Sequence, residues 1–158
     1  MAQWMPMLKN HINEVAALGD RIHTNYPESL ESFRSKFTAS PETCFVLLDE
    51  GICAGYALAH PAEYLNPPAL NTILGQPSTN HDCLHIHDIV IDTPYRGAGL
   101  LNVLMSKLSA FKIHPKQTLI AVGGTAPVWT RYGFQEIKNP QSDAICRTYS
   151  TSALYMCR

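Results

Sequence analysis

One predicted strand carries most of the residues that can transfer protons or bind metals. His81, Cys83, His85 and His87 alternate along it, and Asp88 follows directly. Imidazole titrates near neutral pH and suits proton transfer, while burial can raise the pKa of a carboxyl until it also serves as a base. Because alternate residues of a strand share one face, the histidines and the cysteine also form a candidate Zn or Cu site. The strand therefore predicts either a general base or a metal centre.

A glycine-bearing turn joins the end of this strand to a predicted helix. The turn contains Arg96, Gly97 and Gly99, and leucines follow it. Unpaired N–H groups and a partial positive charge at a helix start bind phosphate, and Arg96 adds a fixed charge. The turn thus predicts a phosphate or pyrophosphate site, with a plain structural turn as the alternative. A Rossmann dinucleotide site is disfavoured, because the turn lies past the middle of the chain and position 102 is Asn.

Two helices and a hairpin precede this unit. Helical spacing of apolar residues predicts the first helix, and the residues are Leu8, Ile12, Val15, Leu18 and Ile22. A second helix begins near residues 27–29 and ends at Pro41. Short apolar runs over 44–48 and 52–59 predict an antiparallel hairpin. Gly55 within the second run indicates a bulge or a close backbone approach.

Strands and helices alternate along the rest of the chain. The proline-rich segment 61–81 predicts a long loop, and such loops often cover a binding site. Strands over 83–91 and 118–122 flank the helix that starts at the glycine turn, so a right-handed crossover makes them parallel neighbours. A short helix around Trp129 and two closing strands complete the chain. We predict an α/β (α+β) fold with a mixed central sheet and flanking helices, as a single domain over 1–158.

Composition excludes several classes of protein. The chain has 158 residues, of which 46% are hydrophobic and 16% are charged, and these fractions are typical of a soluble globule. A formal net charge of −1 disfavours a nucleic-acid-binding surface. We find no signal-peptide pattern and no apolar run of about 20 residues that would cross a membrane. With five scattered cysteines read as reduced thiols, we expect a cytoplasmic protein without nucleic-acid or membrane partners, and a homodimer stays open.

Three short motifs occur in order along the chain. Gly55-Tyr56 lies in the hairpin, Arg96 to Leu101 reads Arg-x-x-Gly-x-Leu, and Ala126 to Phe134 ends as aromatic-x-x-x-Gly-Phe. Together they resemble the GNAT superfamily of acetyl-CoA-dependent N-acetyltransferases, whose hallmark is Arg/Gln-x-x-Gly-x-Gly/Ala. Leu101 departs from the last position of that hallmark. The resemblance implies a GNAT-like acyl-CoA N-acyltransferase fold, in which two parallel strands, here those of Ile89 and Ile120, splay apart.

The resemblance also implies acetyl-CoA as the cosubstrate. The pantetheine arm would pair with the strand edges, and the pyrophosphate would lie on the backbone of 97–101. The implied binding residues are Ile89, Val90, Ile91, Arg96, Gly97, Ala98, Gly99, Leu100, Leu101 and Trp129. The acceptor would be a small amine or amino acid, and we expect the loop with Tyr64, Asn66 and Asn71 to border its pocket. No metal is expected for this activity.

Acetyl transfer needs a neutral amine, although a free alkylamine has a pKa of about 10.4. A general base is therefore useful, and His87 and Asp88 are equal candidates; the alternative is that they only satisfy hydrogen bonds at a strand bulge. Val90 N–H is the implied donor to the oxyanion. The family's acidic Tyr is replaced by Trp129, which is no useful acid, and the nearest phenol, Tyr132, is expected in the core.

Other functions stay open on the sequence alone. The loss of the usual acid at Trp129 is compatible with a non-catalytic acyl-CoA sensor. The alternating histidines are compatible with a metal-binding protein. Cys83 beside His85 would allow transfer through an acetylated cysteine.

Overall fold

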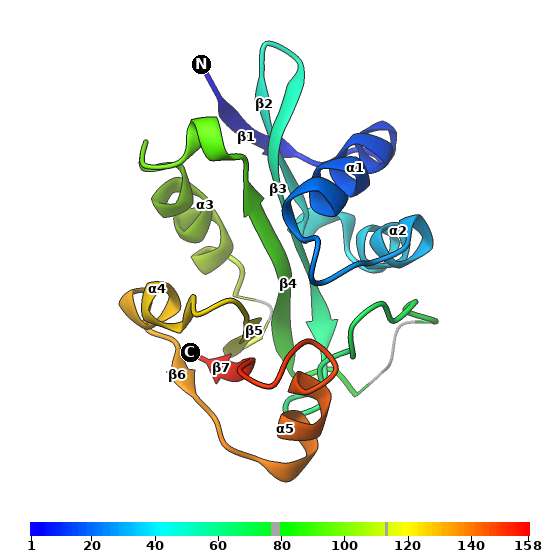
Figure 1. The fold of residues 1–158 in the computed structure, drawn as a ribbon, viewed down its shortest axis with the longest axis vertical. Helices are drawn as coiled ribbons and strands as arrows, with labels where there is room; N and C mark the ends of the chain where they lie inside the picture. Colours follow the sequence, from blue (N-terminus) through cyan, green and yellow to red (C-terminus); the bar gives the residue numbers. More distant parts are fainter. Residues whose placement is uncertain (77–79, 113) are drawn as a thin grey trace.

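A seven-stranded mixed sheet forms the centre of the molecule (Figure 1). The computed structural model describes residues 1–76, 80–112 and 114–158. The strand order is β1-β2-β3-β4-β5-β7-β6, and only β4 and β5 pair in parallel. The strands are β1 (Gln3–Pro6), β2 (Phe45–Asp49), β3 (Ile52–Ala62), β4 (Cys83–Ile91), β5 (Lys116–Ala121), β6 (Gln135–Glu136) and β7 (Leu154–Cys157).

Helices cover both faces of this sheet. The α-helices are α1 (Ile12–Ile22), α2 (Leu30–Ala39), α3 (Leu100–Ser109), α4 (Ala126–Arg131) and α5 (Pro140–Cys146). Short 3-10 turns span Lys9–His11, Pro41–Thr43 and Thr93–Tyr95. One core forms where α1 and α2 pack on β2, β3 and β4, and another where α3 packs on the opposite face. The predicted mixed sheet with flanking helices is confirmed, and none of the described helices has the length and apolar character that a bilayer crossing requires.

Local sequence features explain most element boundaries. Ser29 caps α2 by accepting a hydrogen bond from Ser32 N at 3.1 Å. Gly55 is required in β3 because a Cβ there would lie 2.5 Å from Val90 O. This confirms the predicted close approach. The edge strand β1 and the helix α5 were not predicted. β1 is only four residues long and ends in Pro6, which lacks a backbone N–H, so its sequence gives little strand signal.

The parallel strands β4 and β5 pair only at their first halves. Their register runs from Cys83 with Lys116 to Ile86 with Leu119 and then ends. β4 continues to Ile91, where it pairs with β3 alone. The predicted parallel neighbours are therefore confirmed, and they separate in the middle of the sheet.

A β-bulge lies in β4 at the point where the two strands separate. Leu58 pairs with Asp88, whereas Ala59 pairs with Ile86, so His87 is the extra residue. As a result His87 and Asp88, although adjacent in sequence, both reach partners that come from the α1–α2 side of the sheet. The regular alternation assumed from the sequence ends here.

Candidate active site

The glycine turn before α3 borders an open groove of about 490 Å³. Gly97 and Gly99 have φ values of 80° and 77°, in the left-handed region that favours glycine. A Cβ built on either would meet no atom within 4 Å, so the backbone is accessible from outside. The groove is lined by every predicted cosubstrate-binding residue except Ala98, namely Ile89, Val90, Ile91, Arg96, Gly97, Gly99, Leu100, Leu101 and Trp129.

The second half of β4 presents an unpaired edge to this groove. Asp92 N donates to Ala54 O at 2.9 Å, so residue 92 points toward β3. Backbone groups of successive residues point to opposite sides of a strand. Ile91 therefore points away from β3, and its carbonyl accepts from Arg96 Nε at 2.8 Å. By the same alternation Ile89 also faces the gap toward β5.

Val90 has the opposite orientation. It shares the direction of residue 92, and its carbonyl lies close to Gly55 of β3. The N–H of Val90 is therefore directed at β3 and away from the gap. Ile89, unlike Val90, has an N–H that faces the gap, so the geometry favours Ile89 over Val90 as a donor there.

A second cavity occupies the gap between β4 and β5 and has a volume of about 110 Å³. We call it the acceptor pocket, after the acceptor that the family resemblance leads us to expect. Segments that are distant in sequence line it, and the residues are His23, Tyr26, Glu28, Leu70, Ile86, His87, Asp88, Ile89, Leu119, Ile120, Val122, Thr125, Trp129 and Tyr149. Four residues line both cavities: His23, Ile89, Thr125 and Trp129. The groove and the acceptor pocket are therefore adjacent and share part of their walls.

Asp88 lies in the wall of the acceptor pocket with two side-chain partners. Tyr56 OH donates to Oδ2 at 2.6 Å, and His23 Nε2 lies 2.9 Å from Oδ1. The hydrogen bond to Asp88 raises the pKa of His23. Burial, reinforced by Asp88, raises the pKa of Tyr56, which therefore stays a neutral donor. With 16% of its side chain exposed, Asp88 is accessible from the acceptor pocket.

His87 is held by a buried carboxylate instead. Its Nε2 lies 2.8 Å from Glu28 Oε2, and the two side chains are only 2% and 5% exposed. Burial opposes ionisation of Glu28, but the hydrogen bond with His87 and the charge of Lys36 outweigh it and lower the pKa of Glu28 to about 2. Lys36 Nζ, fully buried, lies 3.6 Å from Glu28 Oε1. Glu28 is therefore a carboxylate at neutral pH.

The sequence did not single out His23, Glu28, Tyr26 or Tyr149 as site residues. The first three lie on the connection between α1 and α2, where no motif marks them, and Tyr149 follows α5. Tyr132, predicted in the core, is half-buried and packs against the α3 core; it lines neither cavity itself, although its hydroxyl contacts Asn102 of the groove. Trp129 lines both cavities, and its indole N–H donates to Thr125 Oγ1 at 3.2 Å.

The candidate metal site, which the sequence left open as an alternative, does not form among the described residues. No group of three or more His, Cys, Asp or Glu in that part of the chain has the geometry to hold a metal ion. His81 contacts His114, at 3.1 Å, instead of the other histidines. Cys83 lines neither cavity, and burial raises the pKa of its thiol to about 11, which opposes its use as a nucleophile.

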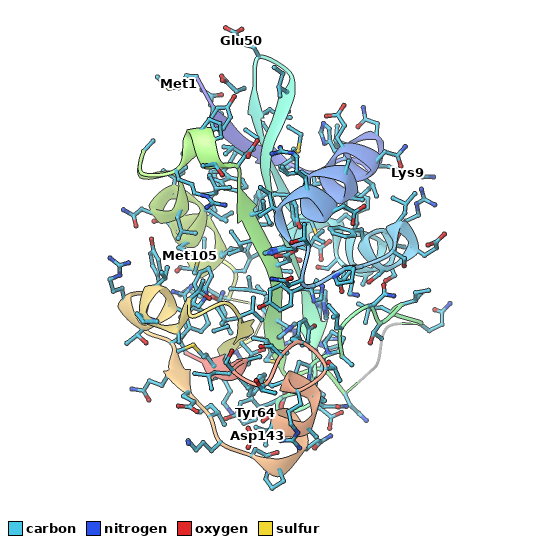
Figure 2. The ribbon with its side chains drawn as sticks, in the orientation of Figure 1. Met1, Lys9, Glu50, Tyr64, Met105 and Asp143 are labelled. Atoms are coloured by element: carbon cyan, nitrogen blue, oxygen red, sulfur yellow. The ribbon has the colours of Figure 1, made fainter. Side chains whose placement is uncertain are left out.

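The proline-rich loop borders the acceptor pocket through part of its length. Asn71 Oδ1 accepts from Ser29 N at 2.7 Å, and Asn71 N donates to Glu28 Oε1 at 3.1 Å. Tyr64 lies elsewhere: its ring packs against Tyr155, in a small core that includes Cys146 of α5. Figure 2 shows Tyr64 at the same end of the molecule as Asp143. Asn66 borders a separate hollow.

Solved structures with the same fold span almost the entire chain. The NatC complex bound to Gag peptide and CoA has 17% identity over 99% of this chain and 96% of that one, with a TM-score of 0.71. Arabidopsis thaliana Naa50 with the bisubstrate analogue CoA-Ac-MVNAL has 12% identity over 99% and 97%, with a TM-score of 0.69. The ribosomal-protein-S18-alanine N-acetyltransferase from Escherichia coli has 18% identity over 99% and 92%, with a TM-score of 0.64.

No curated protein matches the sequence significantly. A family model does match: the acetyltransferase (GNAT) family, over residues 11–123. That range includes α1, α2, the hairpin, β4, the glycine turn and β5. With more than half of its residues matched, the chain belongs to the acetyltransferase (GNAT) family.

Proposed function

We propose that this protein is an acetyl-CoA-dependent N-acetyltransferase that acetylates a small amine. The observation that carries the proposal is that two cavities share wall residues at the point where β4 and β5 separate. One cavity has the glycine turn and a free strand edge, and the other has a carboxylate wall. Related folds have been solved with CoA or a CoA conjugate, which supports the choice of cosubstrate.

Different parts of the groove match the pyrophosphate and the pantetheine arm of a CoA thioester. Backbone N–H groups of the glycine turn and the first turn of α3 would bind the pyrophosphate. The free edge at Ile89 and Ile91 would pair with the amides of the pantetheine arm, as a further strand would. This arrangement brings the thioester to the residues that line both cavities, including His23 and Trp129.

Transfer then forms one bond and breaks one. The amine nitrogen attacks the thioester carbonyl, the N–C bond forms, and the C–S bond breaks. Ile89 N–H faces the gap and would stabilise the oxyanion in place of the originally predicted Val90. A thiol such as the cysteine side chain has a reference pKa of about 8.5, so the CoA thiolate is a weak base that leaves readily and is protonated by solvent. Overall, an acceptor that arrives as an ammonium ion loses two protons and the CoA thiolate gains one, so one proton is released to solvent.

Asp88, with His23 beside it, is the base that we propose. Asp88 is more accessible than His87, with 16% of its side chain exposed against 2%. The pair with His23 provides a route for the proton toward solvent, since His23 is 24% exposed and lines both cavities. His87 and Glu28 would instead fix the geometry of the bulge that orients Asp88.

Replacing Asp88 tests the proposal. Removal of a general base typically costs about 10²–10⁴-fold in turnover, so Asp88→Asn should lower kcat by that factor. Acetyl-CoA affinity, measured by calorimetry, should not change. Thiol release with an amine panel gives the rate, and Asp143→Asn, on α5 and outside both cavities, is the matched control.

Two results would contradict this proposal. If wild-type protein binds acetyl-CoA but releases no thiol with any amine, the fold acts as an acyl-CoA sensor. If Asp88→Asn keeps full turnover, the base lies elsewhere, and His87→Gln becomes the variant to measure.

A further inference from the structure

The two histidines of the acceptor pocket are already bonded to its carboxylates, His23 to Asp88 and His87 to Glu28. Among the described residues that line this pocket, none is Lys or Arg. Its acidic side chains are Glu28 and Asp88, and most of the remaining wall is aliphatic or aromatic. An ammonium entering the pocket is therefore attracted, whereas a carboxylate on the same molecule would meet two carboxylates.

The lysine beside Glu28 already has its ammonium group hydrogen-bonded within the protein. Lys36 Nζ donates to Ser32 Oγ and to Thr72 O, beside Glu28, and its side chain is inaccessible. Glu28 in turn accepts from His87, from Asn71 N at 3.1 Å and from Ser32 Oγ at 3.4 Å. Neither group is available to bind a second charge of either sign on the acceptor.

Residues 66–74, which we call the strap, close one end of the acceptor pocket. On the α2 side Asn71 bonds to Ser29 N and Glu28. On the α5 side Leu70 N donates to Thr148 Oγ1 at 3.0 Å, and Tyr149 OH donates to Pro68 O at 3.0 Å. The strap therefore runs between both walls, and Figure 1 shows it in green between α2 and α5.

The front of the acceptor pocket is also narrow. Tyr26, from the connection between α1 and α2, reaches across until its hydroxyl lies 4.0 Å from a Cβ built on Gly123 after β5. A cavity of about 150 Å³ holds one benzene molecule, and this cavity has about 110 Å³. The space fits a short branched or linear hydrocarbon tail.

We infer that the acceptor is a small primary monoamine with an uncharged apolar tail, rather than an amino acid or a polypeptide N-terminus. The inference rests on the proposed transferase activity. An amino acid would bring an unpaired carboxylate to Asp88 and Glu28, and a polypeptide needs an exit for its following residues where the strap lies. Leu70, which lines the acceptor pocket from the strap, limits the length of the tail.

Four acceptors that share one side chain separate charge from size. Isobutylamine, valinamide, valine and a tetrapeptide beginning with valine are compared by thiol release, with acetyl-CoA binding measured separately by calorimetry. We expect kcat/KM for isobutylamine to exceed that for valine by at least about 100-fold, because an unpaired buried charge is strongly disfavoured. Valinamide should fall between them, and the tetrapeptide should show no turnover.

A variant of the strap tests the size limit independently. Leu70→Ala should raise the ratio of kcat/KM for hexylamine to that for propylamine by about tenfold, the scale of methylene discrimination in apolar pockets. Ile73→Ala is the matched control, since Ile73 lies on the same strap but is 61% exposed and lines no part of the acceptor pocket. An equal change in both variants would contradict the role of Leu70.

The outcomes distinguish this inference from the activity on which it rests. Faster turnover of valine or of the tetrapeptide than of isobutylamine would overturn the inference while supporting the transferase. Acetyl-CoA binding without thiol release for all four acceptors and the alkylamines would overturn the transferase itself. Turnover that falls from isobutylamine to the tetrapeptide would support both.

Discussion

The groove and the acceptor pocket are built in opposite ways. Most of the groove comes from one continuous stretch, residues 89–102, with Trp129 and its neighbours opposite. The acceptor pocket combines the α1–α2 connection, the strap, β4, β5 and the segment after α5. One cavity therefore depends mainly on local backbone conformation, and the other depends on contacts between distant segments.

This difference separates a general function from a specific one. On the proposed function, backbone N–H groups and a strand edge would bind the phosphates and amides that every CoA ester shares. Side chains such as Glu28 and Asp88, held by partners 59 and 65 positions away, would form the surroundings of the variable acceptor. Changes in the groove should thus affect cosubstrate binding, while changes in the acceptor pocket should affect which amine is used.

The largest effect that we expect on the groove comes from Gly99→Val. A β-branched residue at φ 77° is strained by about 1–3 kcal/mol, and its side chain would occupy the surface that receives the pyrophosphate. Acetyl-CoA affinity should therefore fall by about 10–100-fold, measured by calorimetry. Gly75→Val is the matched control, because a Cβ at Gly75 also meets open space and its φ is not positive.

If Gly75→Val weakened acetyl-CoA binding as much as Gly99→Val, the groove would not depend on the local conformation of the turn. A thermal melt of each variant keeps a loss of folding apart from a loss of binding.

Lowering the pH should reduce the free energy of unfolding through His60 and His85, which are buried beside His87. Burial lowers the pKa of His60 to about 3 and that of His85 well below its usual value. As the pH falls below about 6.5, the unfolded chain binds protons that the folded chain does not. The contribution of the two neutral imidazoles to the free energy of unfolding is fully present above that pH. It is lost toward pH 3, at up to about 1.4 kcal/mol per pH unit for each imidazole.

His60→Gln should reduce this slope by on the order of 1 kcal/mol per pH unit in urea unfolding series. His81→Gln removes an exposed histidine and should leave the slope unchanged. An unaltered slope in His60→Gln would show that other groups govern the acid response.

The smallest effect is expected for Tyr132→Phe, because Tyr132 lines neither cavity. Substitutions away from buried or binding features change free energies by about 0.5 kcal/mol or less, so kcat/KM should stay within about twofold. A large fall in kcat would identify Tyr132 as the acid that Trp129 cannot be.

Sequence reasoning named most of the residues that line the groove and missed several that line the acceptor pocket, for the same physical reason. The residue types at Gly97 and Gly99 indicate the backbone conformation of the turn, so the neighbouring groove residues could be predicted from adjacent positions in the sequence. Glu28 and His23 acquire their place only when α1 and α2 pack on the sheet. Neither spacing nor residue type marks them, and the bulge at His87 is a property of pairing with β3 that β4 alone does not encode.

The bulge in β4 changes the parity of that strand. Before it, even-numbered residues such as Leu84 and Ile86 face the α3 core; after it, odd-numbered residues such as Ile89 and Ile91 do. Because Ile86 and Ile89 face the same core, deleting His87 would restore a regular strand without redirecting the later side chains, whereas inserting one residue after the bulge would redirect all of them. After such an insertion, either the Asp88 carboxylate would turn toward the α3 core, or Gly55 and the glycine turn would lose register, so a one-residue insertion should be tolerated less here than a substitution or the deletion of His87.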